Sequence, residues 1–321
     1  MKLESMGLEL ARATEAAALS AGRWMGFGKK DEPDGDAIEA MHRALNQVEM
    51  DGHIVVGEEE KLHRHSLLDT GQQVGTGQGP ELDIVVDPID GRELLARGYP
   101  DAISVAGAAP RGSMWSPPRE AVYMDKIVVN REASEVLVPE CMDAPAAWTL
   151  ALVARAKNKE VRDLVVFVLD RPRHADLIEE VRAVGARVLL RPEGDIAGAL
   201  MAASPKGKVD LLMGAGGIPE GVIATCAVKA LGGAMLGRLA PQSDQEKKAV
   251  KEAGLDTSII LDCDHLISSD EIFFSATGIT DGVFLSGVRY HGNIADTESL
   301  ILNTRTDTRR LIQAEHILPE D

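Results

Sequence analysis

Cysteine is scarce in this sequence. The three cysteines, Cys141, Cys226 and Cys263, lie far apart in the chain. Their spacing therefore predicts neither a zinc knuckle nor a redox pair, and the odd number is typical of a protein from a reducing compartment. We interpret all three as ordinary core or half-buried thiols.

Long apolar runs and an excess of positive charge are also absent. No apolar run approaches the ~20 residues that a membrane-spanning helix needs, and the chain does not open with the pattern of a signal peptide. The formal net charge of -17 argues against nucleic acid or an anionic membrane as the general partner. A phosphorylated small molecule needs only local positive charge and stays compatible with this composition. We expect a cytoplasmic protein.

Several common catalytic and nucleotide-binding motifs are missing. The sequence contains no GxSxG elbow, no P-loop and no GxGxxG fingerprint. The glycine-rich stretch at residues 75–79 follows no convincing strand and opens no helix, so it does not predict a nucleotide loop. His63 and His65 alternate, but they stand in a polar loop, which favours solvated histidines over a zinc site.

The composition predicts a large α/β protein. The chain has 321 residues, of which 45% are hydrophobic, enough for a sizeable core in one large domain or two intimate halves. Residues 3–23 predict an amphipathic helix, and residues 26–36 predict a charged, glycine-rich loop. After residue 145 three strand–helix units follow one another, which predicts a largely parallel sheet. We expect two halves, 1–160 and 161–321, with a soft boundary.

Four carboxylates in the first half stand where elements begin or end. Asp34 precedes a predicted helix, where an N-cap role is the alternative, and Glu58 directly follows the predicted strand "HIVVG". Asp87 and Asp90 stand three apart at the end of "DIVVDPID", where proline and glycine also make good turns. Hard cations such as Mg²⁺ and Mn²⁺ prefer carboxylate oxygens.

Two further places in the second half have groups suited to phosphate chemistry. In "LDRPRH", Arg171, Arg173 and His174 follow a buried strand and enter a helix. Two guanidiniums beside a helix start predict a phosphate site, although surface charge is the alternative. In "GAGGIPEG", Pro219 suits a first helical turn and Glu220 could bind a cation, with a plain strand–helix turn as the alternative.

Taken together, these stretches resemble the class II (GlpX-type) fructose-1,6-bisphosphatases. The resemblance extends from "AGRWMG" to "IQAEH", over almost the whole chain. It rests on blocks that include "PDGDAIEAM", "VVGEEEK", "DIVVDPIDG", "AVYMDKIVV", "LDRPRH", "EGDIAGAL", "GAGGIPEG" and "FFSATGITDGVFLSGVRY".

The resemblance implies a fold, an activity and a cofactor. The family belongs to the lithium-sensitive sugar and inositol phosphatases, the inositol monophosphatase/fructose-1,6-bisphosphatase superfamily, with a layered α/β/α/β/α fold. Its members remove the 1-phosphate of fructose 1,6-bisphosphate, a gluconeogenic step, with a divalent metal, here Mn²⁺ or Mg²⁺. The family and the amphipathic first helix together predict a homo-oligomer, a dimer or a tetramer.

The resemblance also implies roles for individual residues. The metal ligands would be Asp34, Glu58, Asp87, Asp90 and Glu220. The substrate contacts would be Asp90, Gly91, Tyr123, Arg171, Pro172, Arg173, Glu193, Gly194, Asp195 and Gly217. The catalytic candidates would be Lys30, Glu58 and Arg92. Cations held by the acids would neutralise the phosphate charge, while the arginines held the remote 6-phosphate.

The chain departs from the family pattern at groups that orient the attacking water. Arg92 replaces a threonine, Leu62 replaces an aspartate, and Glu59 replaces a glycine. A guanidinium ~4 Å from a divalent ion would repel it by ~8 kcal/mol at an effective dielectric constant of about 20. Arg92 therefore pairs with a nearby acid such as Glu93, Glu59 or Glu60, or weakens a metal site, or grips the phosphate directly.

These departures leave three functions open. The first is fructose-1,6-bisphosphatase activity. The second is a weak or silent paralogue that binds metal and sugar phosphate or serves as a partner subunit. The third is a phosphatase with a shifted substrate, such as sedoheptulose 1,7-bisphosphate.

Overall fold

The computed structural model describes residues 3–58, 65–205 and 207–318. The chain forms two compact units: unit 1 comprises Met1–Met114 with Ser269–Asp321, and unit 2 comprises Trp115–Ser268. This division differs from the boundary near residue 160 expected from the sequence. The reason is a long-range strand pairing, because residues beyond 269 return to complete the sheet that the first 114 residues begin.

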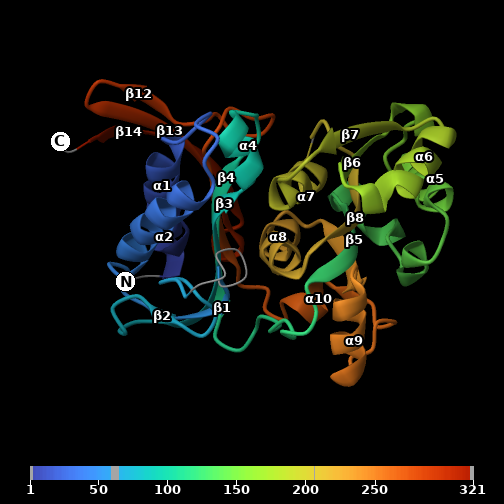
Figure 1. The fold of residues 1–321 in the computed structure, drawn as a ribbon, viewed down its shortest axis with the longest axis horizontal. Helices are drawn as coiled ribbons and strands as arrows, with labels where there is room; N and C mark the ends of the chain where they lie inside the picture. Colours follow the sequence, from blue (N-terminus) through green and yellow to red (C-terminus); the bar gives the residue numbers. More distant parts are fainter. Residues whose placement is uncertain (1–2, 59–64, 206, 319–321) are drawn as a thin grey trace. The chain divides into compact units, whose positions relative to one another are not determined.

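Unit 1 is built on a mixed eight-stranded sheet (Figure 1). Its strands are β1 (Asp51–Val56), β2 (Gln73–Val74), β3 (Glu81–Asp90), β4 (Ile103–Pro110), β11 (Phe273–Gly278), β12 (Arg289–His291), β13 (Ile294–Asn303) and β14 (Thr308–Ile317). They run in the order β12-β13-β11-β4-β3-β1-β2, and β14 pairs with β13. Strands β1 and β3 are parallel, and the other described pairs are antiparallel.

The first helix of unit 1 is a core element. The helices of this unit are η1 (Leu3–Ser5), α1 (Met6–Gly22), α2 (Asp31–Leu45), α4 (Arg92–Arg97) and η6 (Thr304–Thr306). Helix α1 packs across β4, β11 and β13, and its apolar residues Leu10, Ala13 and Ala17 are fully buried. The amphipathic pattern that the sequence showed is therefore explained by packing within this unit.

Unit 2 has a six-stranded sheet in the order β10-β9-β5-β8-β6-β7. Its strands are β5 (Tyr123–Val129), β6 (Val165–Leu169), β7 (Arg187–Arg191), β8 (Leu211–Gly217), β9 (Ala234–Leu239) and β10 (Leu261–Asp262). Among the described strand pairs of this sheet, only those of β6 with β7 and with β8 are parallel. The expectation of a largely parallel sheet was wrong for the rest, because β5 inserts between β8 and β9 and runs opposite to both.

Helices cover both faces of the sheet in unit 2. They are η2 (Arg131–Val136), η3 (Pro139–Met142), α5 (Ala146–Ala156), η4 (Val161–Asp163), η5 (Pro172–His174), α6 (Ala175–Ala183), α7 (Asp195–Ala203), α8 (Ile218–Ala230), α9 (Asp244–Glu252) and α10 (Cys263–Leu266). Helices α7 and α8 pack together on one face, and α5 and α6 pack on the other (Figure 1). Two sheets with helices confirm the α/β class and are consistent with the sugar phosphatase fold.

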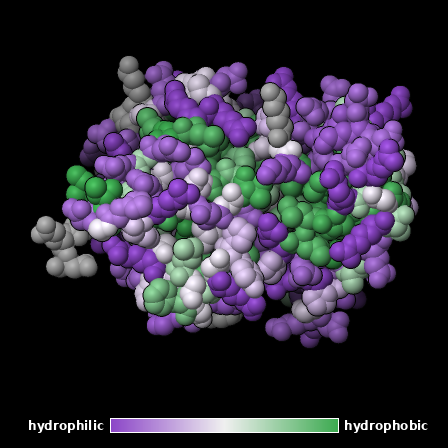
Figure 2. Space-filling view, turned by 90° about the horizontal axis from the view of Figure 1, so that it is seen from above, coloured by the Kyte–Doolittle hydropathy of each residue, from purple (hydrophilic) through white to green (hydrophobic). Residues whose placement is uncertain are grey.

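The surface is largely hydrophilic on the face that Figure 2 shows, with hydrophobic side chains gathered in smaller patches. Among the described residues, no helix combines the length and the apolar character needed to cross a membrane. Cys141 and Cys226 are buried and Cys263 is half-buried, which confirms their interpretation as core or half-buried thiols. Burial raises the pKa of the Cys226 thiol to about 12.

Candidate active site

Asp87 and Asp90 both belong to strand β3. The strand does not break at Pro88, as the sequence suggested, but continues to Asp90 with a register shift against β4 between the two acids. The Ile89 N–H donates to Oδ1 of Asp87 over 3.0 Å. Only 1% of Asp87 is exposed. The irregular strand end thus places two carboxylates in a nearly dry environment.

Glu58 and Asp34 are also buried in unit 1. Glu58 follows β1, and its backbone N–H donates to the carbonyl of Leu68 over 3.1 Å. Asp34 lies inside the first turn of α2, whose N-cap is Lys30, so the N-cap alternative for Asp34 was wrong. Helix α2 begins earlier than expected because Pro33 is tolerated in a first turn and the helix dipole favours acids there.

Arg92 pairs with one of these acids. Its Nη2 lies 2.6 Å from Oδ2 of Asp34 and 3.1 Å from Oδ1 of Asp31. Gly91 precedes it with φ of 95°, a left-handed conformation that glycine adopts readily, so the chain turns from β3 into α4. Among the anticipated acidic partners, Glu93 instead pairs with Lys30. Glu59 and Glu60 lie outside the described residues, as do Leu62 and His63.

The acids of unit 1 fit a divalent cation in donor chemistry, since all are carboxylates. In residues 3–58, 65–205 and 207–318, however, no three His, Cys, Asp or Glu side chains are grouped so that they could hold a metal ion. The guanidinium of Arg92 contacts Oδ2 of Asp34. An ion at that oxygen would have to compete with this positive charge.

In unit 2, the predicted sugar-phosphate residues converge on one edge of the sheet. Strands β6, β7 and β8 are parallel to one another, so their carboxyl ends meet at the same edge, the usual place for ligands in such sheets. The residues that follow these strands are Arg171, Pro172 and Arg173 after β6, Glu193, Gly194 and Asp195 after β7, and Gly217 and Glu220 at and after the end of β8. The first residue of β5, Tyr123, pairs with Gly217 at the same edge.

Two arginines at this edge are held in defined positions. Arg173 donates from Nε and Nη2 to the carbonyl of Ala215 over 3.1 and 2.9 Å, and its guanidinium lies 4.9 Å from the centre of the Tyr123 ring. Arg171 is more exposed, and its Nη2 lies 3.4 Å from Oε1 of Glu193. One arginine is therefore fixed by packing, while the other remains accessible to a ligand.

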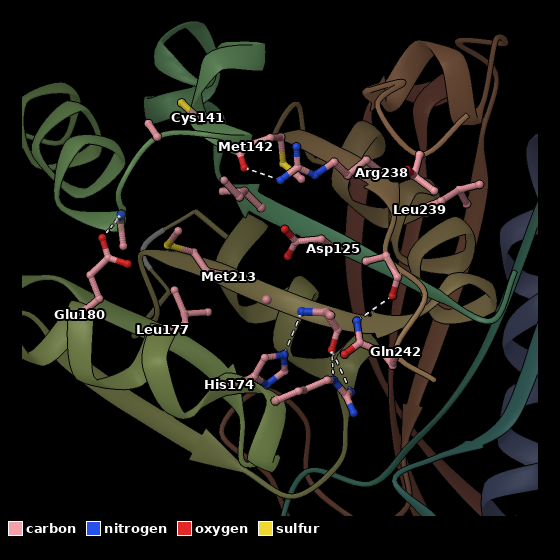
Figure 3. Close-up of a pocket in the computed structure, with 18 of the residues that line it drawn as sticks. Asp125, Cys141, Met142, His174, Leu177, Glu180, Met213, Arg238, Leu239 and Gln242 are labelled. Carbon is pink, nitrogen blue, oxygen red and sulfur yellow. Dashed lines mark hydrogen bonds between the residues drawn. The ribbon is translucent and has the colours of Figure 1, made fainter. Parts of the chain in front are cut away.

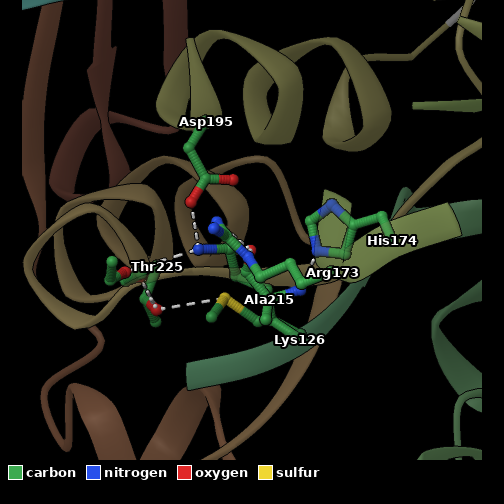
Figure 4. A network of polar contacts seen from close by, with 9 residues as sticks. Lys126, Arg173, His174, Asp195, Ala215 and Thr225 are labelled. Carbon is green, nitrogen blue, oxygen red and sulfur yellow. Dashed lines mark hydrogen bonds and ion pairs between the residues drawn. The ribbon is translucent and has the colours of Figure 1, made fainter. Parts of the chain in front are cut away.

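Lys126 is a residue that the sequence analysis missed. It is only 1% exposed in the middle of β5, where its ammonium contacts Asp195 and lies 3.4 Å from the carbonyl of Gly217. Figure 4 shows this pair beside Arg173. Burial raises the pKa of Asp195, an effect that the charge of Lys126 opposes. A lysine inside the apolar strand "YMDKIVV" requires a buried acid, and this requirement could have revealed it.

The glycines of β8 make room for these acids. A Cβ on Gly216 would lie 1.9 Å from Oδ2 of Asp195, and a Cβ on Gly217 would lie 1.8 Å from Oε2 of Glu220. Any side chain at either position would displace a carboxylate. The sequence "GAGGIPEG" therefore does more than form a strand–helix turn.

Glu246 is a second residue in this region that the sequence analysis did not assign to the site. Ser243 caps α9 by accepting the N–H of Glu246. The carboxylate of Glu246 accepts the backbone N–H groups of Val122 and Tyr123 over 2.8 and 3.0 Å. Helix α9 thereby fixes the start of β5 and the backbone of Tyr123.

A cavity of about 520 Å³ lies in unit 2 and includes Arg173 in its lining (Figure 3). His174 borders it, with Nδ1–H donating to the Leu169 carbonyl over 2.7 Å and Nε2 accepting the Ala215 N–H over 2.9 Å. Burial lowers the pKa of His174, and the hydrogen bond to Leu169 opposes that effect. Burial raises the pKa of Asp125, whose side chain also lines the cavity. His174 is thus held neutral, in one tautomer.

Comparison with known proteins places this chain in a family. The family model described as bacterial fructose-1,6-bisphosphatase, glpX-encoded, matches residues 4–316. The fructose-1,6-bisphosphatase class 2 of Haemophilus influenzae is 37% identical over 329 residues, covering 98% of this chain and 97% of that protein. The fructose-1,6-bisphosphatase 1 class 2 of Escherichia coli K12 is 38% identical over 326 residues, covering 98% and 95%. The chain belongs to the family of glpX-encoded bacterial fructose-1,6-bisphosphatases.

Proposed function

We propose that this chain hydrolyses the 1-phosphate of fructose 1,6-bisphosphate to give fructose 6-phosphate, a reaction of gluconeogenesis. The observation that carries the proposal is the family match over residues 4–316. The arrangement of unit 2 supports it, because the residues that the family resemblance assigns to the sugar phosphate gather at one sheet edge.

The residues of unit 2 would bind and orient the sugar bisphosphate. Arg171 and Arg173 would hold the 6-phosphate through charge-assisted hydrogen bonds, with Tyr123 beside them. Glu193 and Asp195 would accept hydrogen bonds from sugar hydroxyls. The glycines Gly194 and Gly217 and the ring of Pro172 leave space for close approach. Binding energy from this remote end would position the reacting phosphate.

The acids of unit 1 would hold the divalent cation on which the family depends. We propose Mn²⁺ or Mg²⁺, with Asp34, Glu58, Asp87 and Asp90 as ligands. The family resemblance also gives Glu220 a metal-ligand role. The bound cation would neutralise phosphate charge and stabilise the leaving oxygen.

Three side chains of unit 1 remain as catalytic candidates. The Glu58 carboxylate is suited to accept a proton from the water that attacks phosphorus, while the bond to the sugar oxygen breaks and that oxygen takes up a proton. Lys30 and Arg92 would offer positive charge to the phosphate oxygens, once Arg92 exchanges Asp34 for the substrate. Asp90 and Gly91 directly precede Arg92 in the chain and would contact the substrate beside it.

A phosphate-release assay tests the proposal. Purified protein is incubated with fructose 1,6-bisphosphate and Mn²⁺ or Mg²⁺, beside an Arg92→Thr, Leu62→Asp double variant and an Asp87→Asn variant. We expect release by the native chain that requires metal and is lost in Asp87→Asn. Release by the double variant alone would support the silent-paralogue hypothesis, and a parallel assay with sedoheptulose 1,7-bisphosphate would detect a shifted substrate.

A further inference from the structure

Strand β14 is an edge of the sheet in unit 1. It pairs over its whole length, Thr308 to Ile317, with β13, and in the described part of the chain it pairs with no other strand. Alternate backbone amides and carbonyls of an edge strand point away from its neighbour and can pair with another strand. This edge is ten residues long and contains no proline, so its backbone offers an unusually complete template.

The side chains of β14 show which face is open. Odd-numbered residues, from Arg309 to Ile317, are exposed, whereas most even-numbered ones are half-buried. Two of the exposed residues are large and apolar, with Leu311 57% and Ile317 81% exposed. Short, charged or covered edges are the usual protection against pairing. An edge of this length, whose exposed side chains include two large apolar ones, indicates a partner.

We propose that β14 pairs with β14 of a second copy of this chain, antiparallel and about a two-fold axis at Ile312. A two-fold axis normal to the sheet places odd-numbered residues opposite odd-numbered ones and even-numbered residues opposite even-numbered ones. Ile312 therefore lies opposite Ile312 of the second chain. Leu311 then faces Gln313 of the other chain and lies diagonally next to the second Leu311. Arg309 faces Glu315 of the other chain, and the symmetry makes this pair twice.

The charged side chains of β14 favour the register with the axis at Ile312 over the register with the axis at Gln313. Moving the axis from Ile312 to Gln313 would pair Arg309 with Ile317 and Arg310 with His316, and both Arg–Glu pairs would be lost. Opposite charges directly across an antiparallel pair are stabilising, and like charges are destabilising. The sequence of β14 is therefore complementary to itself in one antiparallel register.

Arg309 and Glu315 of the same chain are too far apart to form an ion pair with each other. They are six residues apart on one strand, which separates them by about 20 Å at the rise of an extended chain. Among the described residues, neither has an oppositely charged side chain within ion-pair distance. The guanidinium of Arg309 lies 5.6 Å from the centre of the Phe284 ring, and a guanidinium stacked on a ring can still donate hydrogen bonds to a carboxylate.

A charge-swap experiment tests the pairing. Sedimentation velocity over a concentration series would be measured for the native full-length chain, for Arg309→Glu, for Glu315→Arg and for the double variant. Each single change places like charges opposite each other twice, so we expect the dimer Kd to rise by at least about tenfold. The double variant restores two opposite-charge pairs and should return the native Kd.

Arg310→Glu provides the matched control. Arg310 is on the same strand but on the other face, opposite Ala314 of the second chain in this register, so its reversal should leave the Kd nearly unchanged. A native protein that remains monomeric at about 100 μM, or an oligomer indifferent to Glu315→Arg, would overturn the proposal. So would a double variant as weak as the single ones. The inference is independent of the proposed activity, which none of these exposed residues serves.

Discussion

Arg92 and Asp34 form an ion pair, 2.6 Å long, between the start of α4 and the first turn of α2. Asp34 is only 3% exposed, so this is a contact with a buried carboxylate and not a loose surface pair. Of the interpretations that the sequence left open for Arg92, this geometry favours a weakened metal site, because the guanidinium contacts a carboxylate that the family resemblance assigns to a cation.

Replacing Arg92 with threonine should tighten metal binding. The variant removes a positive charge beside the proposed ligand Asp34, and like charges repel strongly in a partly dry site. We expect Mn²⁺ to bind on the order of tenfold to a hundredfold more tightly to Arg92→Thr, measured by isothermal titration calorimetry without substrate. Because the readout is binding, it does not depend on catalytic activity.

Arg97→Thr is the control for this measurement. Arg97 is the last residue of the same helix and pairs with Glu93, away from Asp34. The Arg97→Thr substitution removes the same charge from α4. A general charge effect would therefore change the Mn²⁺ affinity of Arg97→Thr and Arg92→Thr equally. Equal affinities of the native chain and Arg92→Thr would contradict the role given to Arg92.

The same variant should be less stable when metal is absent. Without Arg92, the buried Asp34 carboxylate loses a partner, and breaking a buried pair from one side is costly. Because the Arg92 side chain is itself 20% exposed, we expect a loss of roughly 1–3 kcal/mol in the free energy of unfolding. Urea titration with and without Mn²⁺ checks this. Saturating Mn²⁺ should stabilise the variant more than the native chain.

Lys126 should be a positioning residue for Asp195. Lys126→Met would leave the Asp195 carboxylate buried beside Glu220, and we expect a loss of roughly 3–5 kcal/mol in stability. The double variant with Asp195→Asn should recover much of it, because neither buried charge then remains. Lys126→Met should also weaken binding of fructose 6-phosphate, measured calorimetrically, by more than Asp125→Asn on the opposite sheet face does. Equal weakening would show a merely structural role.

Local patterns predicted where the proposed sugar-phosphate residues of unit 2 stand relative to the strands. Strand–helix units place Arg171, Asp195 and Glu220 just beyond strand ends, and parallel pairing brings such ends together wherever it occurs. The position of β5 between β8 and β9 could not be predicted, because it depends on pairing between segments about a hundred residues apart. The compact units divide the chain away from residue 160 for the same reason.

The sequence was also limited in predicting which side chains pair with one another. The position of Arg92 beside Asp90 follows from the sequence, but its partner Asp34 is 58 residues away and is selected by how α2 and α4 pack. The environment of Lys126 was predictable in part. Its burial in an apolar strand was readable, and the need for an acid partner follows from it, whereas the identity of Asp195 required the fold.

His174 should make the stability of the protein depend on pH. Its two ring nitrogens are both engaged in the neutral form, and burial lowers its pKa below the ordinary value of 6.5. The unfolded chain takes up the proton at higher pH than the folded chain, so the stabilisation is complete above pH 6.5 and is lost as the pH falls toward the folded pKa. We expect the free energy of unfolding to fall by up to about 1.4 kcal/mol per pH unit below this point.

In His174→Gln, whose amide can both donate and accept, urea titrations from pH 7.5 to 5 should show a flatter profile. His65→Gln, at a fully exposed side chain, should retain the native slope, and an unchanged slope in His174→Gln would assign the pH dependence to other groups.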